Sequence, residues 1–158
     1  MLVKNKDIYF RCDASVTIGI GHAVRCLAIA NILKRLDYKI TFIMSSSRGN
    51  MIEQIRNENY EVIELPSFNF PINYDLARAN KNYIQRKFEQ SEKRIIRDKF
   101  GDRKKAGTLV VDHYLLSKEW EVEVQKFFYR VIVIDDLLDS PHVCSAIIDP
   151  NIRHESEI

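Results

Sequence analysis

The sequence contains little cysteine. Its 158 residues include three, Cys12, Cys26 and Cys144, which lie far apart and form no Cys-x-x-Cys pair. A scattered, odd set of cysteines excludes a disulfide framework and a zinc ribbon. We therefore expect reduced thiols in a cytoplasmic protein, with Cys12 and Cys26 as inert core residues because they adjoin apolar segments.

Long hydrophobic runs and an excess of one charge are also lacking. The N-terminal MLVKNKDIYFRCD contains no apolar stretch suited to a signal peptide, and no run approaches the ~18 residues that a membrane span needs. We expect no membrane partner. The net charge is +2, which argues against nucleic acid as a partner. The basic segment 87–105 also contains acids at helical spacing, which is typical of a solvated helix face.

The composition, 46% hydrophobic and 29% charged, suits one globular domain, which we place at 1–150. Short apolar runs rich in β-branched and aromatic residues predict strands at 7–12, 39–44, 60–65, 108–112, 130–135 and 145–149. Helical periodicity predicts helices at 22–36, 49–59, 76–100 and 117–128, with a loop at 66–75. Alternating strands and helices, with Val/Ile runs typical of strands buried on both faces, predict a doubly wound, Rossmann-like, mostly parallel α/β sheet.

In such a sheet, ligands bind outside the carboxyl ends of the strands. Several of the predicted strands end in polar side chains, and we expect these to gather at one edge. They are Asp13, Asp112, His113, Tyr114, Asp135, Asp136 and Asp149. Acids and imidazoles at one edge indicate a site for acid–base chemistry on a polar ligand.

The joint between the first strand and the first helix reads Gly19-Ile20-Gly21-His22. Glycine tolerates positive φ and lets a ligand approach the backbone. The helix N-terminus behind it favours an anionic ligand. We expect His22 to project into the crevice as a neutral general base.

Other interpretations of these residues remain open. GIGHAV matches half of a dinucleotide fingerprint, but Val24 stands where Gly or Ala is expected and no acid follows the second strand. The glycines would also suit simple packing of strand on helix, and His22 or Asp13 would suit capping. Because adjacent acids point opposite ways along a strand, Asp135 and Asp136 are a poor metal site. His142 and His154 are expected at the surface.

The segment RCDASVTIGIGHAVRCLAIANIL resembles the N-terminal signature of the UDP-sugar hydrolases of pseudaminic acid biosynthesis. The matching residues are Arg11, Asp13, Ser15, Gly19, Gly21, His22 and Arg25. VVDHY at 110–114, VIDDLLDSPHVC at 133–144 and IIDPN at 147–151 resemble later segments of that family, in the same order.

This resemblance implies the N-terminal half of a GT-B-like, two-domain fold. It also implies hydrolysis, without metal or other cofactor, of UDP-2,4-diacetamido-2,4,6-trideoxy-β-L-altropyranose to UDP and free sugar. His22 would activate the water, and Asp13 would orient the imidazole or the water. Asp112 and Tyr114 are candidates for sugar contacts, and we assign Gly19, Gly21, Arg25 and His113 to substrate binding on the same motifs.

Members of that family continue with a second α/β domain that holds most nucleotide contacts, whereas this sequence stops at Ile158. We expect residues 151–158 to begin an interdomain linker, the second domain to act in cis or in trans, and the chain alone to turn over weakly or not at all. A GT-B glycosyltransferase acceptor domain and a non-catalytic sugar-binding module are the alternative functions.

Overall fold

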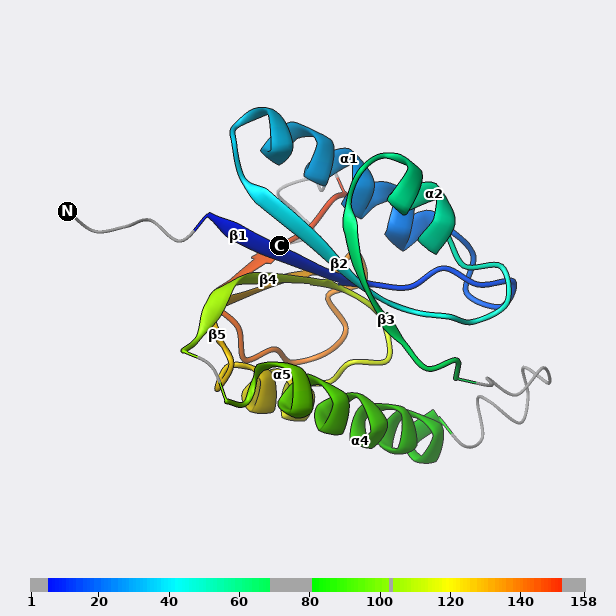
Figure 1. Cartoon of the computed structure of the whole chain (residues 1–158). Coiled ribbons are helices and arrows are strands. Elements are labelled where there is room, and N and C mark those ends of the chain that lie inside the picture. Colours follow the sequence, from blue (N-terminus) through cyan, green and yellow to red (C-terminus); the bar gives the residue numbers. More distant parts are fainter. Residues whose placement is uncertain (1–5, 69–80, 103, 152–158) are drawn as a thin grey trace.

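Six parallel strands form the centre of the structure, a computed structural model that describes residues 6–68, 81–102 and 104–151 (Figure 1). The strands are β1 (Asp7–Cys12), β2 (Lys39–Ser45), β3 (Glu61–Leu65), β4 (Ala106–Asp112), β5 (Phe128–Ile134) and β6 (Ala146–Ile148). Their order is β3-β2-β1-β4-β5-β6, and each neighbouring pair is parallel. The predicted doubly wound, mostly parallel α/β fold is confirmed.

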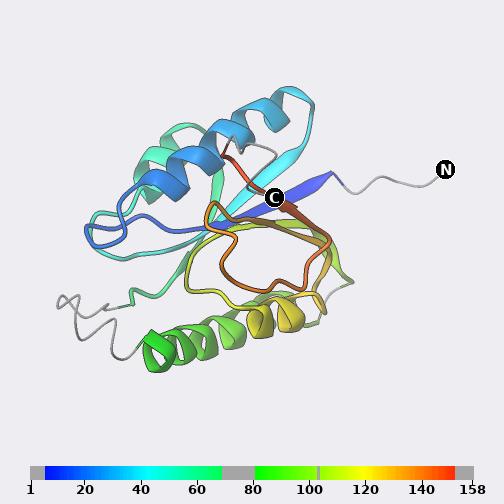
Figure 2. The same cartoon turned by 180° about the vertical axis from the view of Figure 1, so that it is seen from behind.

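Helices cover both faces of this sheet. One face carries α1 (Gly21–Arg35) and α2 (Ile52–Asn57), and the opposite face carries α4 (Lys81–Phe100) and α5 (Lys118–Val124) (Figures 1 and 2). The chain builds the sheet outward from β1 to β3 and then returns to β4 on the other side of β1. The carboxyl ends of β1 and β4 therefore adjoin, with Cys12 beside Asp112 in register. Such a reversal of strand order creates a crevice suited to ligands.

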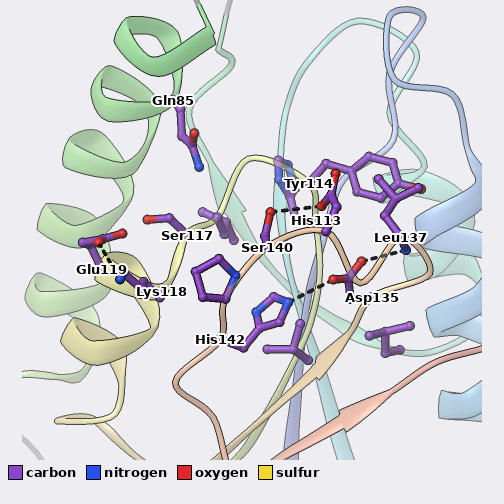
Figure 3. A pocket seen from close by; sticks show the side chains of 15 residues that line it. Gln85, His113, Tyr114, Ser117, Lys118, Glu119, Asp135, Leu137, Ser140 and His142 are labelled. Carbon is purple, nitrogen blue, oxygen red and sulfur yellow. Dashed lines mark hydrogen bonds and ion pairs between the residues drawn. The ribbon is translucent and has the colours of Figure 1, made fainter. Parts of the chain in front are cut away.

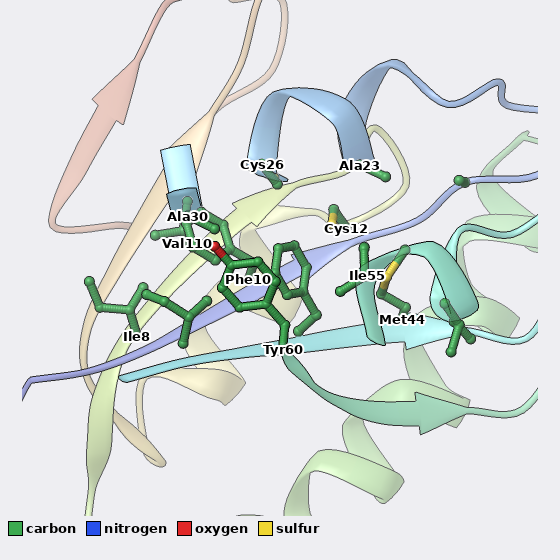
Figure 4. Close-up of a cluster of buried hydrophobic side chains, with 14 of the residues drawn as sticks. Ile8, Phe10, Cys12, Ala23, Cys26, Ala30, Met44, Ile55, Tyr60 and Val110 are labelled. Atoms are coloured by element: carbon green, nitrogen blue, oxygen red, sulfur yellow. The ribbon is translucent and has the colours of Figure 1, made fainter. Parts of the chain in front are cut away.

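The core beneath α1 and α2 is apolar and closely packed (Figure 4). Phe10 and Phe42 stack with ring centroids 5.3 Å apart. Cys12 and Cys26 are fully buried free thiols, as expected from their apolar surroundings. Apart from His22, the buried residues of α1 are small: Ala23, Cys26 and Ala30.

The core beneath α4 and α5 centres on the fully buried Trp120 and Phe128. The charged helix α4 also turns two acids inward, which corrects the expectation of a solvated face for the acids at 87–105. Glu92 is 3% exposed and Glu89 is 5% exposed. Glu89 accepts a hydrogen bond from the backbone N–H of Ser117 (2.7 Å), just before α5.

Most element boundaries differ from the predictions by one to three residues. The second helix is shorter than 49–59, because the chain reaches helical geometry only at Ile52 and leaves it after Asn57. The helix predicted at 117–128 is α5, which ends at Val124 because Phe128 already begins β5. The predicted loop 66–75, the start of helix 76–100 and the linker 151–158 lie largely outside the described residues.

Within the described ranges, no helix combines the length and the apolar character needed to cross a membrane.

Candidate active site at the carboxyl edge of the sheet

The segment between β1 and α1 folds back on itself. Ser15 and Gly19 exchange two backbone hydrogen bonds, of 3.1 and 2.8 Å. The Ser15 hydroxyl oxygen accepts bonds from the backbone N–H groups of Thr17 and Ile18. Gly19 has a φ of +78°, a conformation that side chains disfavour. Gly21 has no such φ, and a Cβ placed there would meet nothing within 4 Å.

Helix α1 begins at Gly21 without an N-capping side chain. Ile20 precedes it without a side-chain capping bond, and its first turn contains no acid. The first N–H groups of an α-helix and the positive end of its dipole favour an anionic ligand. That this turn binds an anionic ligand stays a prediction.

His22, in the first turn of α1, pairs with Asp112 at the end of β4. Its Nδ1 lies 2.6 Å from Oδ1 of Asp112. Burial alone would raise the pKa of Asp112, but hydrogen bonds from His22 and Arg25 outweigh it and lower that pKa below its usual value. An ionised carboxylate only accepts, so Nδ1 donates its proton. The lone pair of the neutral ring then sits on Nε2, as a general base requires.

Arg25, one turn along α1, holds the other side of this carboxylate. Its Nε donates to Oδ2 of Asp112 and its Nη2 to Oδ1, both at 2.7 Å. Its Nη1 also reaches Asp136 at 3.4 Å. Such a bidentate contact is strong and sets the carboxylate plane. Arg25, assigned above to substrate binding, therefore orients Asp112 in this structure.

Tyr114 lies against the His22 ring. The two rings meet edge to face, with centroids 4.5 Å apart. The Tyr114 hydroxyl donates to Asp136, 2.8 Å from Oδ1, and half of the residue is exposed. Burial of the phenol and its hydrogen bond to Asp136 raise the pKa of Tyr114 to about 12. Tyr114 is thus a neutral side chain at the mouth of the site.

Contrary to expectation, the His22 ring does not project into an open crevice. Its side chain is only 8% exposed. It packs between Asp112 and Tyr114.

Asp13 occupies a separate buried network. Its Oδ1 accepts the backbone N–H of Ser45 at 2.7 Å, and its Oδ2 lies 3.1 Å from Nε2 of His113. Arg11 donates to it at 2.8 Å and also binds Glu92. Burial would raise the pKa of Asp13, but the Arg11 charge and these hydrogen bonds hold it well below the usual range.

The prediction that Asp13 orients the imidazole is therefore corrected, since Asp112 holds His22. Asp13 instead ties together the ends of β1 and β2 and the residue that follows β4. His113 is 9% exposed and accepts the backbone N–H of Leu115 on Nδ1, so its Nε2 donates to Asp13. Phe88 stacks on its ring at 5.0 Å. This half of the predicted site has the character of a rigid support.

The two acids after β5 point apart, as expected for neighbours on an extended chain. Asp136 turns toward Tyr114 and Arg25, whereas Oδ2 of Asp135 lies 3.0 Å from Nε2 of His142. His142 was expected at the surface, which is wrong: its side chain is 9% exposed and also contacts Glu121. Among the described residues, no three His, Cys, Asp or Glu side chains form a cluster suited to a metal ion.

Sequence reasoning missed Glu92, Glu121 and the role of Asp136. The two glutamates stood among other charges on amphipathic helices, where acids usually face solvent. Asp136 lay in a quoted motif, but its partners are 22 and 111 positions away along the chain. Periodicity does not report such distances.

A cavity of about 180 Å³ adjoins this edge (Figure 3). It is bounded by the residues after β4, by the start of α5 and by the loop after β5. Lining residues include His113, Tyr114, Ser117, Asp135, Ser140 and His142. Drug-sized ligands occupy pockets of roughly 300–1,000 Å³, so this cavity suits a smaller group.

Comparison with known proteins shows the fold. The structure resembles that of LpCGTa in complex with UDP, with a TM-score of 0.54 and 16% identity over 82% of this chain. It also resembles TcCGT1 in complex with UDP, with a TM-score of 0.53 and 13% identity over 81% of this chain. At such identities the likeness supports the Rossmann-like architecture alone.

The chain spans about 30% of the length of the first of these proteins and 28% of the second. No protein-family model and no curated protein sequence matches it.

Proposed function

We propose that this chain is the N-terminal, base-bearing domain of a GT-B-type enzyme that acts on a UDP-sugar. The His22–Asp112 pair carries the proposal, because it places an oriented imidazole at the N-terminus of α1, where the sheet reverses its strand order. The two structures of similar fold fit this proposal, since both were solved in complex with UDP.

The reaction is displacement at the anomeric carbon. A hydroxyl oxygen attacks that carbon, the bond from the carbon to the diphosphate oxygen breaks, and UDP leaves with the electron pair. Nε2 of His22 takes the proton of the attacking hydroxyl. Asp112 stabilises the resulting imidazolium through Nδ1, and Arg25 holds Asp112 in place. A positioned base of this kind contributes about 10²–10⁴-fold to the rate.

UDP is already a good leaving group, so this chemistry needs no strong general acid. The uncapped first turn of α1 favours the negative charge that develops on the diphosphate. We propose that a second domain, in cis or in trans, supplies most contacts to the nucleotide. The chain alone would then have little turnover.

Access to His22 depends on Tyr114 in this proposal. The imidazole is 8% exposed and Tyr114 covers one side of it. A swing of the half-exposed Tyr114 ring would open Nε2 to the attacking hydroxyl. The phenol would then contact the sugar at the mouth of the site.

The attacking hydroxyl belongs either to an acceptor or to water. In our first candidate function, a glycosyltransferase, it belongs to an acceptor, which fits a fold shared with proteins that bind UDP. The sequence motifs around Gly19, His22 and Asp112 favour the second candidate, hydrolysis of UDP-2,4-diacetamido-2,4,6-trideoxy-β-L-altropyranose in pseudaminic acid biosynthesis. Both use the same base, and only the species that is deprotonated differs.

Product analysis tests the proposal. The protein, together with whatever its reading frame encodes after residue 158, is incubated with UDP-sugars in the presence and absence of sugar acceptors. Released UDP is measured by a coupled assay and the sugar product by mass spectrometry. A glycoside product indicates transfer, and free sugar independent of acceptor indicates hydrolysis.

The matched variants are His22→Ala and Val24→Ala, which change neighbouring positions of the same helical turn. Val24 is exposed and contacts neither Asp112 nor Tyr114 by a hydrogen bond. We expect His22→Ala to slow UDP release about 10²–10⁴-fold and Val24→Ala to leave it unchanged. Wild-type turnover in His22→Ala would refute the assignment of the base.

A further inference from the structure

His142 is held between two carboxylates that the proposed reaction does not use. Its Nδ1 lies 2.6 Å from Oε1 of Glu121 on α5, and its Nε2 lies 3.0 Å from Oδ2 of Asp135 at the end of β5. Figure 3 shows the ring beside Asp135 at the wall of the cavity. We call these three side chains the His142 clamp.

The geometry of the clamp requires a cation. Ionised carboxylates only accept hydrogen bonds, so both ring nitrogens donate, and an imidazole with two N–H groups carries a positive charge. Burial alone lowers the pKa of His142, but its hydrogen bonds to Asp135 and Glu121 outweigh burial and raise that pKa above the usual 6.5.

The same carboxylates hold both ends of the loop that carries His142. Oδ1 of Asp135 accepts the backbone N–H of Leu137 at 2.9 Å. Oε2 of Glu121 accepts the backbone N–H of Val143 at 2.6 Å. Between them, Leu138 has a φ of +51°, which a leucine keeps only when its surroundings impose it. The clamp therefore closes the 135–143 loop against α5.

This loop also carries Asp136, which reaches the candidate active site. Asp136 accepts the Tyr114 hydroxyl at 2.8 Å and contacts Arg25 at 3.4 Å. Tyr114 packs on His22, and Arg25 holds Asp112. Because Asp135 and Asp136 are adjacent in the chain, a shift of the backbone at Asp135 also displaces Asp136. The contact of Asp135 with His142 is thereby coupled to the contacts of Asp136 at the candidate active site.

We propose that His142 is a positioning residue for the His22–Asp112 pair: its cation joins Glu121 to Asp135 and thereby keeps Asp136 in contact with Tyr114 and Arg25. This inference rests on the proposed function of His22 as the base. His142 itself touches no reacting group. It acts by fixing the loop that borders the site.

Other charged or titratable groups also lie near His142. Those lining the same cavity are Lys118 and Glu119 from α5, His113 and Tyr114 after β4, and Asp139 from the loop itself. The Cys144 thiol follows two residues later, and its pKa is raised first by burial and then by the Glu121 charge. None of these described groups hydrogen-bonds His142, whereas Glu121 and Asp135 both do. The contacts of the His142 clamp therefore depend on the charge of His142 itself.

The direction of the pH dependence follows. A raised pKa in the folded protein means that the clamp contributes fully below the ordinary histidine pKa and is lost as pH rises through the folded value. Above it, one ring nitrogen turns a lone pair toward a carboxylate. The loop then loosens, and Asp136 loses its fixed position against Tyr114 and Arg25.

The first test needs no variant and no substrate. Nuclear magnetic resonance of the full chain follows the ring proton of His142 from about pH 6 to pH 9, together with amide exchange at Leu137 and Val143. We expect protection factors, which correct for intrinsic exchange, to fall about tenfold or more through the His142 titration. Protection that stays constant across that titration overturns the clamp.

Variants supply the second test. In His142→Gln we expect low protection of Leu137 and Val143 at every pH. In Glu121→Gln, which keeps an oxygen for Val143, we expect the His142 pKa to fall by about one unit or more. Ser140→Ala, an exposed change in the same loop, is the matched control and should behave as wild type. A wild-type His142 pKa in Glu121→Gln contradicts the clamp.

A third measurement separates positioning from simple loop packing. The ring proton of His22 should show an inflection at the pKa of His142, absent in His142→Gln and retained in Ser140→Ala. Its absence from wild type overturns the positioning role while leaving His22 as the base. If the inflection is present but His22→Ala keeps full UDP release, the proposed function fails, and with it the positioning of a base.

Discussion

Nδ1 of His22 and Oδ1 of Asp112 lie 2.6 Å apart, although 90 positions separate the two residues in the chain. The contact exists because the first turn of α1 and the end of β4 meet where the strand order reverses. A base and its orienting carboxylate thus come from two different β–α units. The consequences of this contact can be tested by substituting single residues.

Replacing Asp112 with Asn should slow UDP release about 10²–10⁴-fold, because the amide neither secures the Nδ1–H tautomer nor balances the imidazolium. Arg25 would also lose the carboxylate that it holds by two hydrogen bonds. Steady-state kinetics of the catalytically competent protein checks the rate, and thermal unfolding confirms that the variant is folded. Val24→Ala again serves as the control. A folded Asp112→Asn protein with wild-type kinetics would contradict the pairing.

Tyr114 should titrate with a pKa of about 12, above the usual 10.0. Its neutral form is the one that donates to Asp136, so the bond stabilises the fold below the ordinary pKa and is lost as pH rises through the folded value. In Asp136→Asn we expect the phenol to titrate closer to about 10. Ultraviolet difference titration, with Tyr114→Phe subtracted to isolate this tyrosine, measures both values. Equal values in wild type and variant would count against the hydrogen bond.

Glu92 should matter for stability far more than a surface acid. It pairs with the fully buried Arg11, and its removal leaves that guanidinium with Asp13 as its remaining carboxylate partner. We expect Glu92→Ala to lower the free energy of unfolding by about 3–5 kcal/mol, measured by urea denaturation. Glu53→Ala, which breaks an exposed pair with Arg56, should lower it far less, because solvent screens exposed ion pairs. Similar losses in both variants would show that the buried pair has no special weight.

Gly19 and Gly21 should respond in opposite ways to alanine. Gly19 has a φ of +78°, so Gly19→Ala should cost about 1–2 kcal/mol of unfolding free energy. Gly21 begins α1 with open space around its Cα and no positive φ, so Gly21→Ala should be neutral or gain up to about 1 kcal/mol. Thermal and urea denaturation of the two variants compare them directly. A larger loss for Gly21→Ala would disprove this account of the turn.

The sequence pattern predicts much of the fold. The Val/Ile runs at 108–112 and 130–135 predicted buried parallel strands, and the structure has β4 and β5 there. Apolar spacing in 22–36 predicted α1 to within one residue at each end. These features are properties of a short stretch of chain, because burial on both faces or on one stripe leaves its period in the local sequence.

The sequence predicts the candidate site only in part. The Gly19–His22 motif indicated a ligand-facing turn with an imidazole, and the strand-end rule drew Asp13, Asp112 and Tyr114 to one edge. The sequence did not predict which of these side chains pair with one another. Asp13 went to Arg11 and His113, while Asp112 took His22. Both aspartates satisfy the same sequence rule, so nothing in the pattern separates them.

Local spacing thus specified the strands, the helices and the kinds of group at the sheet edge. Folding in three dimensions selected the partners: it buried His142 between Glu121 and Asp135, turned Glu92 inward onto Arg11, and laid Tyr114 over His22. The physical reason is distance along the chain. Periodicity reflects neighbours within a few residues, whereas the register of β1 against β4 sets which charges from remote segments meet in a low-dielectric interior.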